Sequence, residues 1–359
     1  MNMSGFERLI VGGISLAVIA GAFMWVRADL ARYYRLVRLT AILTLVLIVL
    51  GAYVRLSDAG LGCPDWPGCY GNLTPAHSSD EIRAAEMVQP GGPVSMAKAW
   101  KEMVHRYLAM IVGALIAAIM LRSWVDGKRW RLSPVLPTVT ALAVIFQAAL
   151  GAWTVTMLLK PAIVTSHLLG GITILALLAT ILFRVGGTAG WCAPIAPTPP
   201  LKWMGMIAIV VLACQIILGG WVSTNYAALA CQDFPTCHGQ WIPGMDFANA
   251  FHIIRPLGVG PDGELLTIEA LRAIHWVHRL GALVALLVVG WFALLLLKQP
   301  TGRAVGKMLL MALALQIVLG VSNILFSLPL PVAVAHNGVA AMLFVLLLLI
   351  NLRISKPGY

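Results

Sequence analysis

Four histidines occupy matching places in the two halves of this sequence. An internal repeat pairs His105 with His278 and His167 with His336. Ionisable residues inside apolar spans are rare and usually functional. Two neutral imidazoles on neighbouring helices can ligate one haem iron from its two sides, in a bundle core whose apolar walls accept the porphyrin. Because a zinc site would need a third or fourth ligand nearby, and none stands at matching places, we predict two haem pockets, one in each half.

The two predicted pockets differ in one nearby residue. Glu102 stands three residues before His105, on the same helical face. At the matching place before His278 stands His275. A carboxylate beside just one of the two irons suggests that one pocket reacts while the other binds or conducts electrons. The alternative is a solvated acid at a helix start, where the helix dipole favours negative charge, and the spacing does not decide between them.

Arg106 and Arg279 each directly follow one of the histidines. One interpretation is that they pair with haem propionates, because guanidinium groups bind carboxylates through paired hydrogen bonds. The other is that they only charge the membrane interface. The sequence leaves both interpretations open.

Two cysteine pairs recur at equal spacing in two long loops. The matched cysteines are Cys63, Cys69, Cys231 and Cys237. The loops are predicted to face the oxidising side of the membrane, so we expect a local disulfide in each, which in the chain-entropy model stabilises the fold by about 2–3 kcal/mol. A structural role is favoured over redox-active thiols. Cys192 and Cys214 have no repeat partner and are predicted to be free.

The elements that position these residues must be membrane helices. Of the 359 residues, 60% are hydrophobic and only 11% are charged, and the mean hydropathy is +0.89. Soluble domains average about 45–50% apolar and about 25% charged residues, so a water-soluble enzyme, a disordered chain and a nucleic-acid-binding domain are excluded. We predict an all-α polytopic membrane protein. The net charge of +11 then reports topology rather than an acidic partner.

Nine apolar segments approach the roughly 20 residues that a spanning helix needs. They lie near residues 9–26, 36–55, 101–121, 134–157, 162–183, 203–224, 270–297, 304–326 and 332–351. Lysines and arginines concentrate in alternate connections, which the positive-inside rule makes cytoplasmic. The C-terminus is then inside, and the long loops 56–100 and 225–269 lie outside.

The repeat divides the chain into two four-helix halves, residues 36–183 and 203–351. An even number of helices in each repeat makes the halves parallel, with a pseudo-two-fold axis along the membrane normal. Residues 184–202 form a cytoplasmic linker and 352–359 a cytoplasmic tail. Residues 1–35 are predicted to add a membrane anchor helix, because the apolar run exceeds the usual core of a secretory signal, which is the alternative.

The chain resembles the haem A synthase family, also called the cytochrome oxidase assembly protein 15 family, over about residues 36–351. The motifs that carry the resemblance are GAYVRLSDAGLGCPDWPGCYG at 51–71, EMVHR at 102–106, TSH at 165–167, HR at 278–279 and HN at 336–337. The long first-loop motif together with the four histidines is highly specific. Residues 1–35 depart from the family pattern.

The resemblance implies an eight-helix core and the oxidation of the methyl group at ring position 8 of haem O. That oxidation passes through a hydroxymethyl group to the formyl group of haem A. His105 and His167 would flank the substrate haem, with Glu102 as the essential acid. His278 and His336 would ligate a haem b. The cysteines match the bacterial type of the family that has a pair in both outer loops.

The resemblance also implies neighbours and a location. Haem O synthase and cytochrome oxidase assembly are the expected partners, alongside the lipid bilayer and without nucleic acid. A bacterial inner membrane with periplasmic cysteine loops is favoured, because residues 1–35 do not form an amphipathic transit leader. The electron donor, the oxidant and a homo-oligomeric state stay open.

Two other functions compete with this interpretation. A di-haem cytochrome b that exchanges electrons with quinone would share the four histidines, but it needs neither a carboxylate in one pocket nor matched cysteine loops. A transporter built on parallel repeats would show charges near the middle of broken helices, whereas the ionisable residues here lie near the outer helix ends.

Overall fold

A computed structural model describes residues 5–187, 194–260 and 263–355 of the chain. Within these ranges the protein is helical, with only isolated β-bridges in the loops, and eight helices are long and apolar enough to cross a membrane. They are α2 (Leu30–Leu56), α4 (Met96–Trp130), α5 (Val135–Thr156), α6 (Pro161–Gly187), α7 (Pro199–Thr224), α9 (Ile268–Leu297), α10 (Arg303–Leu325) and α11 (Leu330–Ser355). The predicted class, an all-α polytopic membrane protein, is confirmed.

A further helix, α1 (Gly5–Val26), precedes these eight. Its described apolar part, Gly12–Val26, is shorter than the spans that follow. Asp29 then separates α1 from α2, because its carboxylate accepts hydrogen bonds from the first backbone amides of α2 and so caps the new helix. α1 packs on α4, and Val26 is fully buried there. The extra N-terminal helix therefore forms and is attached to the core.

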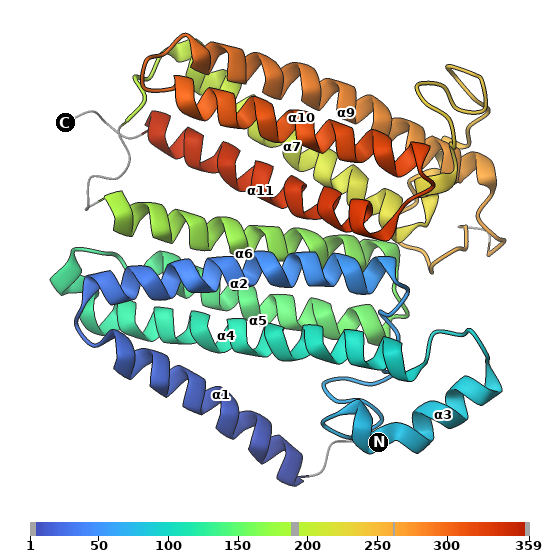
Figure 1. Cartoon of the computed structure of the whole chain (residues 1–359), viewed down its shortest axis with the longest axis horizontal. Helices are drawn as coiled ribbons and strands as arrows, with labels where there is room; N and C mark the ends of the chain where they lie inside the picture. Colours follow the sequence, from blue (N-terminus) through green and yellow to red (C-terminus); the bar gives the residue numbers. More distant parts are fainter. Residues whose placement is uncertain (1–4, 188–193, 261–262, 356–359) are drawn as a thin grey trace. The chain divides into compact units, whose positions relative to one another are not determined.

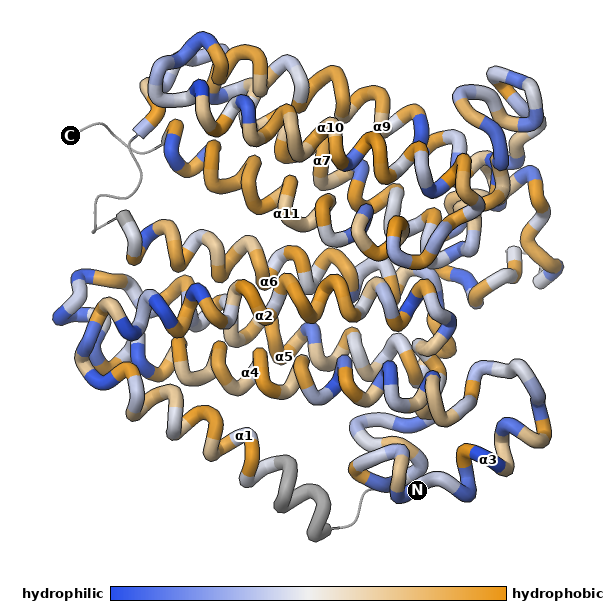
Figure 2. Tube along the Cα trace, in the orientation of Figure 1, coloured by the Kyte–Doolittle hydropathy of each residue, from blue (hydrophilic) through white to orange (hydrophobic). Residues whose placement is uncertain are grey.

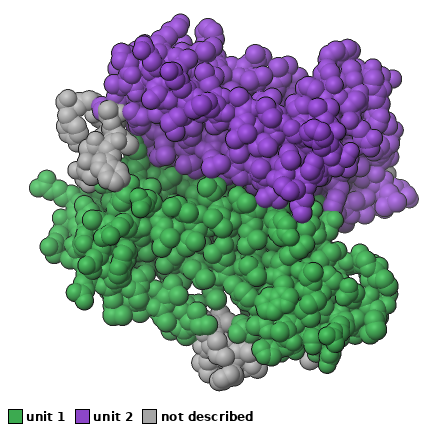
Figure 3. All heavy atoms as spheres, viewed as in Figure 1, with its two compact units in different colours: residues 1–159, 166–189 green, residues 160–165, 190–359 purple. Residues whose placement is uncertain are grey.

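The first compact unit comprises residues 1–159 and 166–189 (Figure 3). Helix α4 contacts α1, α2 and α5, and α2, α4 and α5 run roughly parallel in Figure 1. Leu36, Ile116 and Leu178, from α2, α4 and α6, meet in one buried apolar cluster. This unit holds the first predicted histidine pair.

The second unit comprises residues 160–165 and 190–359. Its four long helices contact one another in a closed cycle, α7 with α9, α9 with α10, α10 with α11 and α11 with α7. Phe292 and Leu343 are among its fully buried side chains. The unit is thus a four-helix bundle and holds the second histidine pair. The predicted repeat ranges 36–183 and 203–351 stay a prediction, and part of the linker lies outside the described residues.

Helix α4, which carries three of the predicted site residues, is longer than its apolar segment. The hydroxyl of Ser95 accepts a hydrogen bond from the amide of Lys98 and caps the first turn. The helix ends where Arg131 adopts a left-handed conformation. Because capping and packing, not hydropathy, set these ends, the predicted range 101–121 was too short at both ends.

The two long loops contain the remaining helices. The first loop holds η1 (Pro75–Ser78) and α3 (Ser79–Val88), and the second holds η2 (Ala227–Leu229) and α8 (Phe247–Ala250). Figure 2 shows that hydrophobic residues dominate the long helices while hydrophilic residues gather at helix ends and in loops. The loops therefore supply the polar groups that meet the ends of the bundles.

Candidate functional site

The first histidine pair comes from two helices of the first unit. His105 lies on α4 and His167 on α6, and their ring centroids are 6.5 Å apart. A metal–imidazole bond is about 2.0–2.1 Å long, so two imidazoles that ligate one metal atom from opposite sides have centroids roughly 6–6.5 Å apart. The separation in the structure fits one iron atom between the rings.

The two residues of the second pair lie in the second unit. His278 lies on α9 and His336 on α11, two helices that both contact α7 and α10. Both residues of each predicted pair therefore belong to one compact unit.

Glycines on neighbouring helices make room for all four imidazole rings. The glycines that face the rings are Gly51 on α2, Gly151 on α5, Gly219 on α7 and Gly320 on α10. A methyl group at any of them would lie 3.0–3.2 Å from a ring atom of the facing histidine. Only glycine avoids this close contact, so each histidine has a cradle that a larger residue would fill. The cradles and the ring separation fit haem ligation.

Three glutamines that the sequence analysis did not assign to the site accompany the histidines. The amide nitrogens of Gln147, Gln215 and Gln316 lie 3.1–3.3 Å from a ring nitrogen of His167, His278 and His336 respectively. Each glutamine stands four residues before one of the cradle glycines. The spacing Gln-x-x-x-Gly in a span, facing a histidine on the next helix, is the signal that could have found them.

Glu102 is buried and paired. Its side chain is only 5% exposed, and its carboxylate accepts hydrogen bonds from the amide of Cys63 at 2.9 Å and from Arg106 at 2.5 Å. The alternative of a solvated acid at a helix start is therefore wrong. Its catalytic role stays a prediction.

Arg106 connects this carboxylate to the first cysteine loop. Besides Glu102, its guanidinium donates to the backbone carbonyls of Asp65, Pro67 and Gly68 at 2.8, 3.3 and 2.6 Å. The arginine thus holds the loop on the N-terminal part of α4, beside His105. A contact with a haem propionate stays a prediction.

The second unit uses the same arrangement without a carboxylate. Arg279 donates to the backbone carbonyls of Cys231 and Thr236 at 2.9 and 2.7 Å. Its Nε donates at 3.2 Å to Nε2 of His275, which occupies the place of Glu102 and is also buried. The two sites therefore share their loop attachment and differ in the charge of one buried side chain.

Both predicted disulfides are present. The S–S distances are 2.06 Å for Cys63–Cys69 and 2.01 Å for Cys231–Cys237. An aspartate organises each loop, since Asp65 accepts from two backbone amides at 2.7 Å and Asp233 accepts from the Thr236 hydroxyl and the amides of residues 238 and 239. The Thr236 hydroxyl and the Gly239 amide hold the pKa of Asp233 far below its usual range.

The two unmatched cysteines take no part in these loops. Cys214 on α7 is free and exposed, as predicted, and Cys192 lies outside the described residues. The other four cysteines form the two loop disulfides, so neither disulfide involves Cys214.

We expect an Arg106→Met substitution to destabilise the first loop. The change removes several hydrogen bonds from a charged donor, each worth about 1.5–3 kcal/mol, and it leaves Glu102 buried without its ion pair, so we expect a loss of about 2–4 kcal/mol. Thermal unfolding of the purified protein measures this. Arg83→Met, on the exposed face of α3, is the control, and an equal midpoint in both variants would contradict the assignment.

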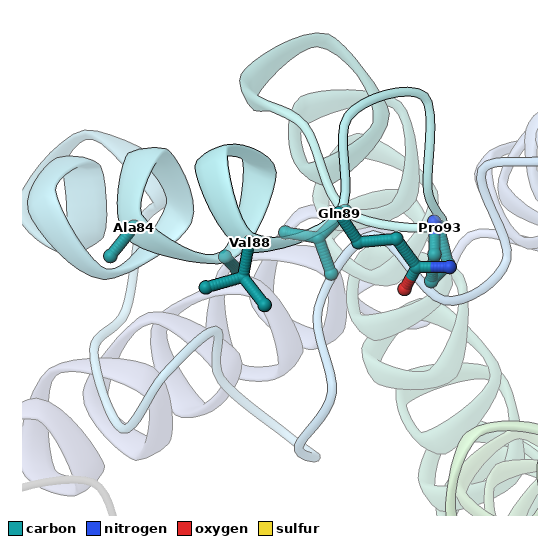
Figure 4. Close-up of a pocket in the computed structure, with 6 residues that line it drawn as sticks. Ala84, Val88, Gln89 and Pro93 are labelled. Atoms are coloured by element: carbon teal, nitrogen blue, oxygen red, sulfur yellow. The ribbon is translucent and has the colours of Figure 1, made fainter.

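The first loop also contains a pocket of about 390 Å³ (Figure 4). Its lining residues are Ala84, Ala85, Val88, Gln89, Pro93 and Val94. None of them ionises at neutral pH or ligates a haem. The candidate chemistry therefore lies at the histidine pairs and not in this pocket.

The chain is similar to known proteins over most of its length. A family model described as COX15-CtaA, cytochrome oxidase assembly protein, matches residues 34–348. A protein named Heme A synthase from Shewanella oneidensis is 40% identical over 319 residues, which is 88% of this chain and 94% of that protein. Heme A synthases from a Chelativorans species and from Halalkalibacterium halodurans are 31% and 28% identical, over 88% and 67% of this chain and 87% and 74% of their own lengths.

Proposed function

Because the chain belongs to the COX15-CtaA family of cytochrome oxidase assembly proteins, we propose that it is a haem A synthase. It oxidises the methyl group at ring position 8 of haem O, through a hydroxymethyl group, to the formyl group of haem A. The relatives named Heme A synthase support this activity. The observation that carries it is the buried carboxylate of Glu102 beside one of two similar histidine pairs.

The two histidine pairs hold different haems in this proposal. His105 and His167 bind the substrate haem, and His278 and His336 bind a haem b as an electron carrier or structural cofactor. The bound haems supply the iron redox chemistry that amino-acid side chains lack. The ring separation of the first pair and the glycine cradles of both support this assignment.

Glu102 handles protons and charge at the reacting methyl group. Each of the two oxidations replaces one C–H bond of the methyl group by a C–OH bond; with water as the source of the oxygen, it releases two protons and also two electrons, which pass to an external oxidant. The resulting hydrate loses water to give the aldehyde. A buried carboxylate can accept such protons, and in a low dielectric it stabilises a developing positive charge far better than in water. Arg106 and the Cys63 amide hold the carboxylate in place. His275 in the second unit supplies no negative charge, which makes that pocket the non-reacting one.

We further propose that the chain is a multi-pass protein of a bacterial inner membrane. The cysteine loops lie in the periplasm and the C-terminus in the cytoplasm, supported by the basic residues in alternate connections and by two disulfides, which form in oxidising compartments. Haem O synthase provides the substrate, and cytochrome oxidase assembly uses the product.

Expression of the chain with a supply of haem O tests the activity. We expect the hydroxymethyl and formyl derivatives among the extracted haems, identified by mass. The same cells without the chain are the control. If the chain is instead a di-haem cytochrome that exchanges electrons with quinone, the extracted haems carry only the unmodified methyl group.

A further inference from the structure

The four histidines differ in what stands beside their rings on the neighbouring helix. Three of them face a Gln-x-x-x-Gly element, and the elements are Gln147 with Gly151, Gln215 with Gly219 and Gln316 with Gly320. The fourth, His105, faces Gly51 on α2, and the residue four places before that glycine is Leu47. A leucine at this place offers no hydrogen bond to an imidazole.

The glutamine amides are fixed against the histidines. The amide nitrogen of Gln147 donates at 2.7 Å to the backbone carbonyl of His167 and lies 3.1 Å from its Nδ1. Gln215 repeats both contacts with His278, at 3.0 and 3.1 Å. The amides of Gln147 and Gln215 are thus attached to the same residue whose ring they accompany. The amide nitrogen of Gln316 lies 3.3 Å from Nε2 of His336.

The glutamines also carry an unused acceptor. The amide oxygens of Gln147, Gln215 and Gln316 are buried and have no hydrogen-bond partner, which is costly unless something else supplies a donor. An imidazole that ligates a metal keeps a proton on its second nitrogen and almost always donates it to an oxygen, which fixes the ring and raises its basicity as a ligand. Rotation of the Gln147 or Gln215 amide would bring its oxygen to that proton, in exchange for the bond that the amide nitrogen makes to the backbone carbonyl.

His105 is also oriented differently from the other three rings. The ring atom closest to a methyl group built on the facing glycine is Cε1 for His167, His278 and His336, at 3.0–3.2 Å, but Nε2 for His105, at 3.0 Å. Within the described residues the ring of His105 makes no hydrogen bond that would fix this orientation. Two independent observations, the leucine and the ring orientation, therefore separate His105 from the rest.

We propose that the three glutamines position His167, His278 and His336 as permanent haem ligands, and that His105 is an exchangeable ligand. The inference rests on the proposed function only in requiring that both histidine pairs bind haem. The second unit then holds its haem by two fixed ligands, as a resident cofactor needs. The first unit holds its haem by one, as a site that must release its product needs.

The exchangeable side of the first site is also the side of the carboxylate. Glu102 and His105 lie on one face of α4, less than one helical turn apart. Release of His105 therefore frees space next to Glu102, while His167 on α6 keeps its contact with Gln147. In this scheme Leu47 determines which of the two haems can be exchanged, because it offers His105 no hydrogen bond.

Carbon monoxide binding to the reduced full-length protein, loaded with haem b in both sites, tests the inference without any turnover. Carbon monoxide replaces only an imidazole that leaves the iron, so we expect it to bind half of the haem. In Leu47→Gln we expect this binding to weaken by about 10-fold or more, the usual size of a lost or gained partner of a metal ligand. In Gln215→Leu we expect the second haem to bind carbon monoxide as well. In Gln215→Glu, which keeps an acceptor oxygen, we expect the second haem to bind no carbon monoxide.

The possible results separate this inference from the proposed function. Equal carbon monoxide binding at both sites, or at neither, in the unsubstituted protein overturns the inference while the proposed function stands. Unchanged binding in both Leu47→Gln and Gln215→Leu also overturns it. A chain that takes up no haem at all overturns both. Because Gln215→Leu and Leu47→Gln lie in different units, misfolding of one variant leaves the other as a test.

Discussion

A Glu102→Gln variant is expected to form haem A at least about 100-fold more slowly, because a positioned acid or base contributes about 10²–10⁴-fold to a rate. The amide has nearly the same shape as the carboxylate, and its oxygen can still accept the hydrogen bond from Cys63. The change therefore removes the negative charge and the proton acceptor while it keeps the loop contact. Haem A per mole of protein, measured by mass spectrometry of extracted haems, gives the result.

Two controls separate chemistry from folding in this experiment. The disulfide content and the haem content of the Glu102→Gln protein should equal those of the unsubstituted chain. Glu86→Gln, on an exposed position of α3, should leave the product yield unchanged. Normal haem A formation by Glu102→Gln would remove the carboxylate from the mechanism, even if the chain is a haem A synthase.

Replacement of His336 by alanine is expected to eliminate the low-spin b-type absorption spectrum of the second site. His336→Ala removes one of two axial nitrogens, and an apolar pocket offers no substitute ligand. His278→Ala should have the same effect, and in both variants the haem content of the purified protein should fall by about half, since each unit has one pair of ligands. An absorption spectrum of the reduced protein and a haem assay measure both quantities.

The matched variants in the first unit give the opposite pattern. His167→Ala should abolish haem A formation and leave the b-type spectrum of the second site intact. If the spectrum of the second site survives in both His278→Ala and His336→Ala, the ligand assignment is refuted.

Much of the fold could be predicted because the bilayer imposes a simple rule on the sequence. A spanning helix needs an apolar run of about 20 residues, and each of the eight spans among the described residues overlaps a predicted segment. The histidine pairs and the cysteine pairs were found through the repeat, because duplicated units place equivalent residues at equivalent depths. Helix ends were less accurate, since Ser95 caps α4 outside its apolar segment.

The contacts that define the site could not be predicted in the same way. Arg106 binds carbonyl groups of residues about 40 positions away, and carbonyl groups carry no sequence signature. The burial of Glu102 depends on the folded loop that covers it. Gln215 has no counterpart at the equivalent place of the first half, where Leu47 stands. Gln147 and Gln316 do correspond in the repeat, but a glutamine in an apolar span does not by itself indicate a contact with a histidine on another helix.

The hydrogen bond between Glu102 and the amide of Cys63 sets an order for the maturation of the protein. The apolar sequence of α4 is sufficient for its insertion into the bilayer, but a buried carboxylate is costly until it is paired. Its partners, the Cys63 amide and the Arg106 side chain that also binds residues 65–68, come together only when the loop has folded against α4. We therefore expect the pocket of the first unit to be completed only after the loop has folded, so that helix insertion alone yields a chain that is spanning but immature.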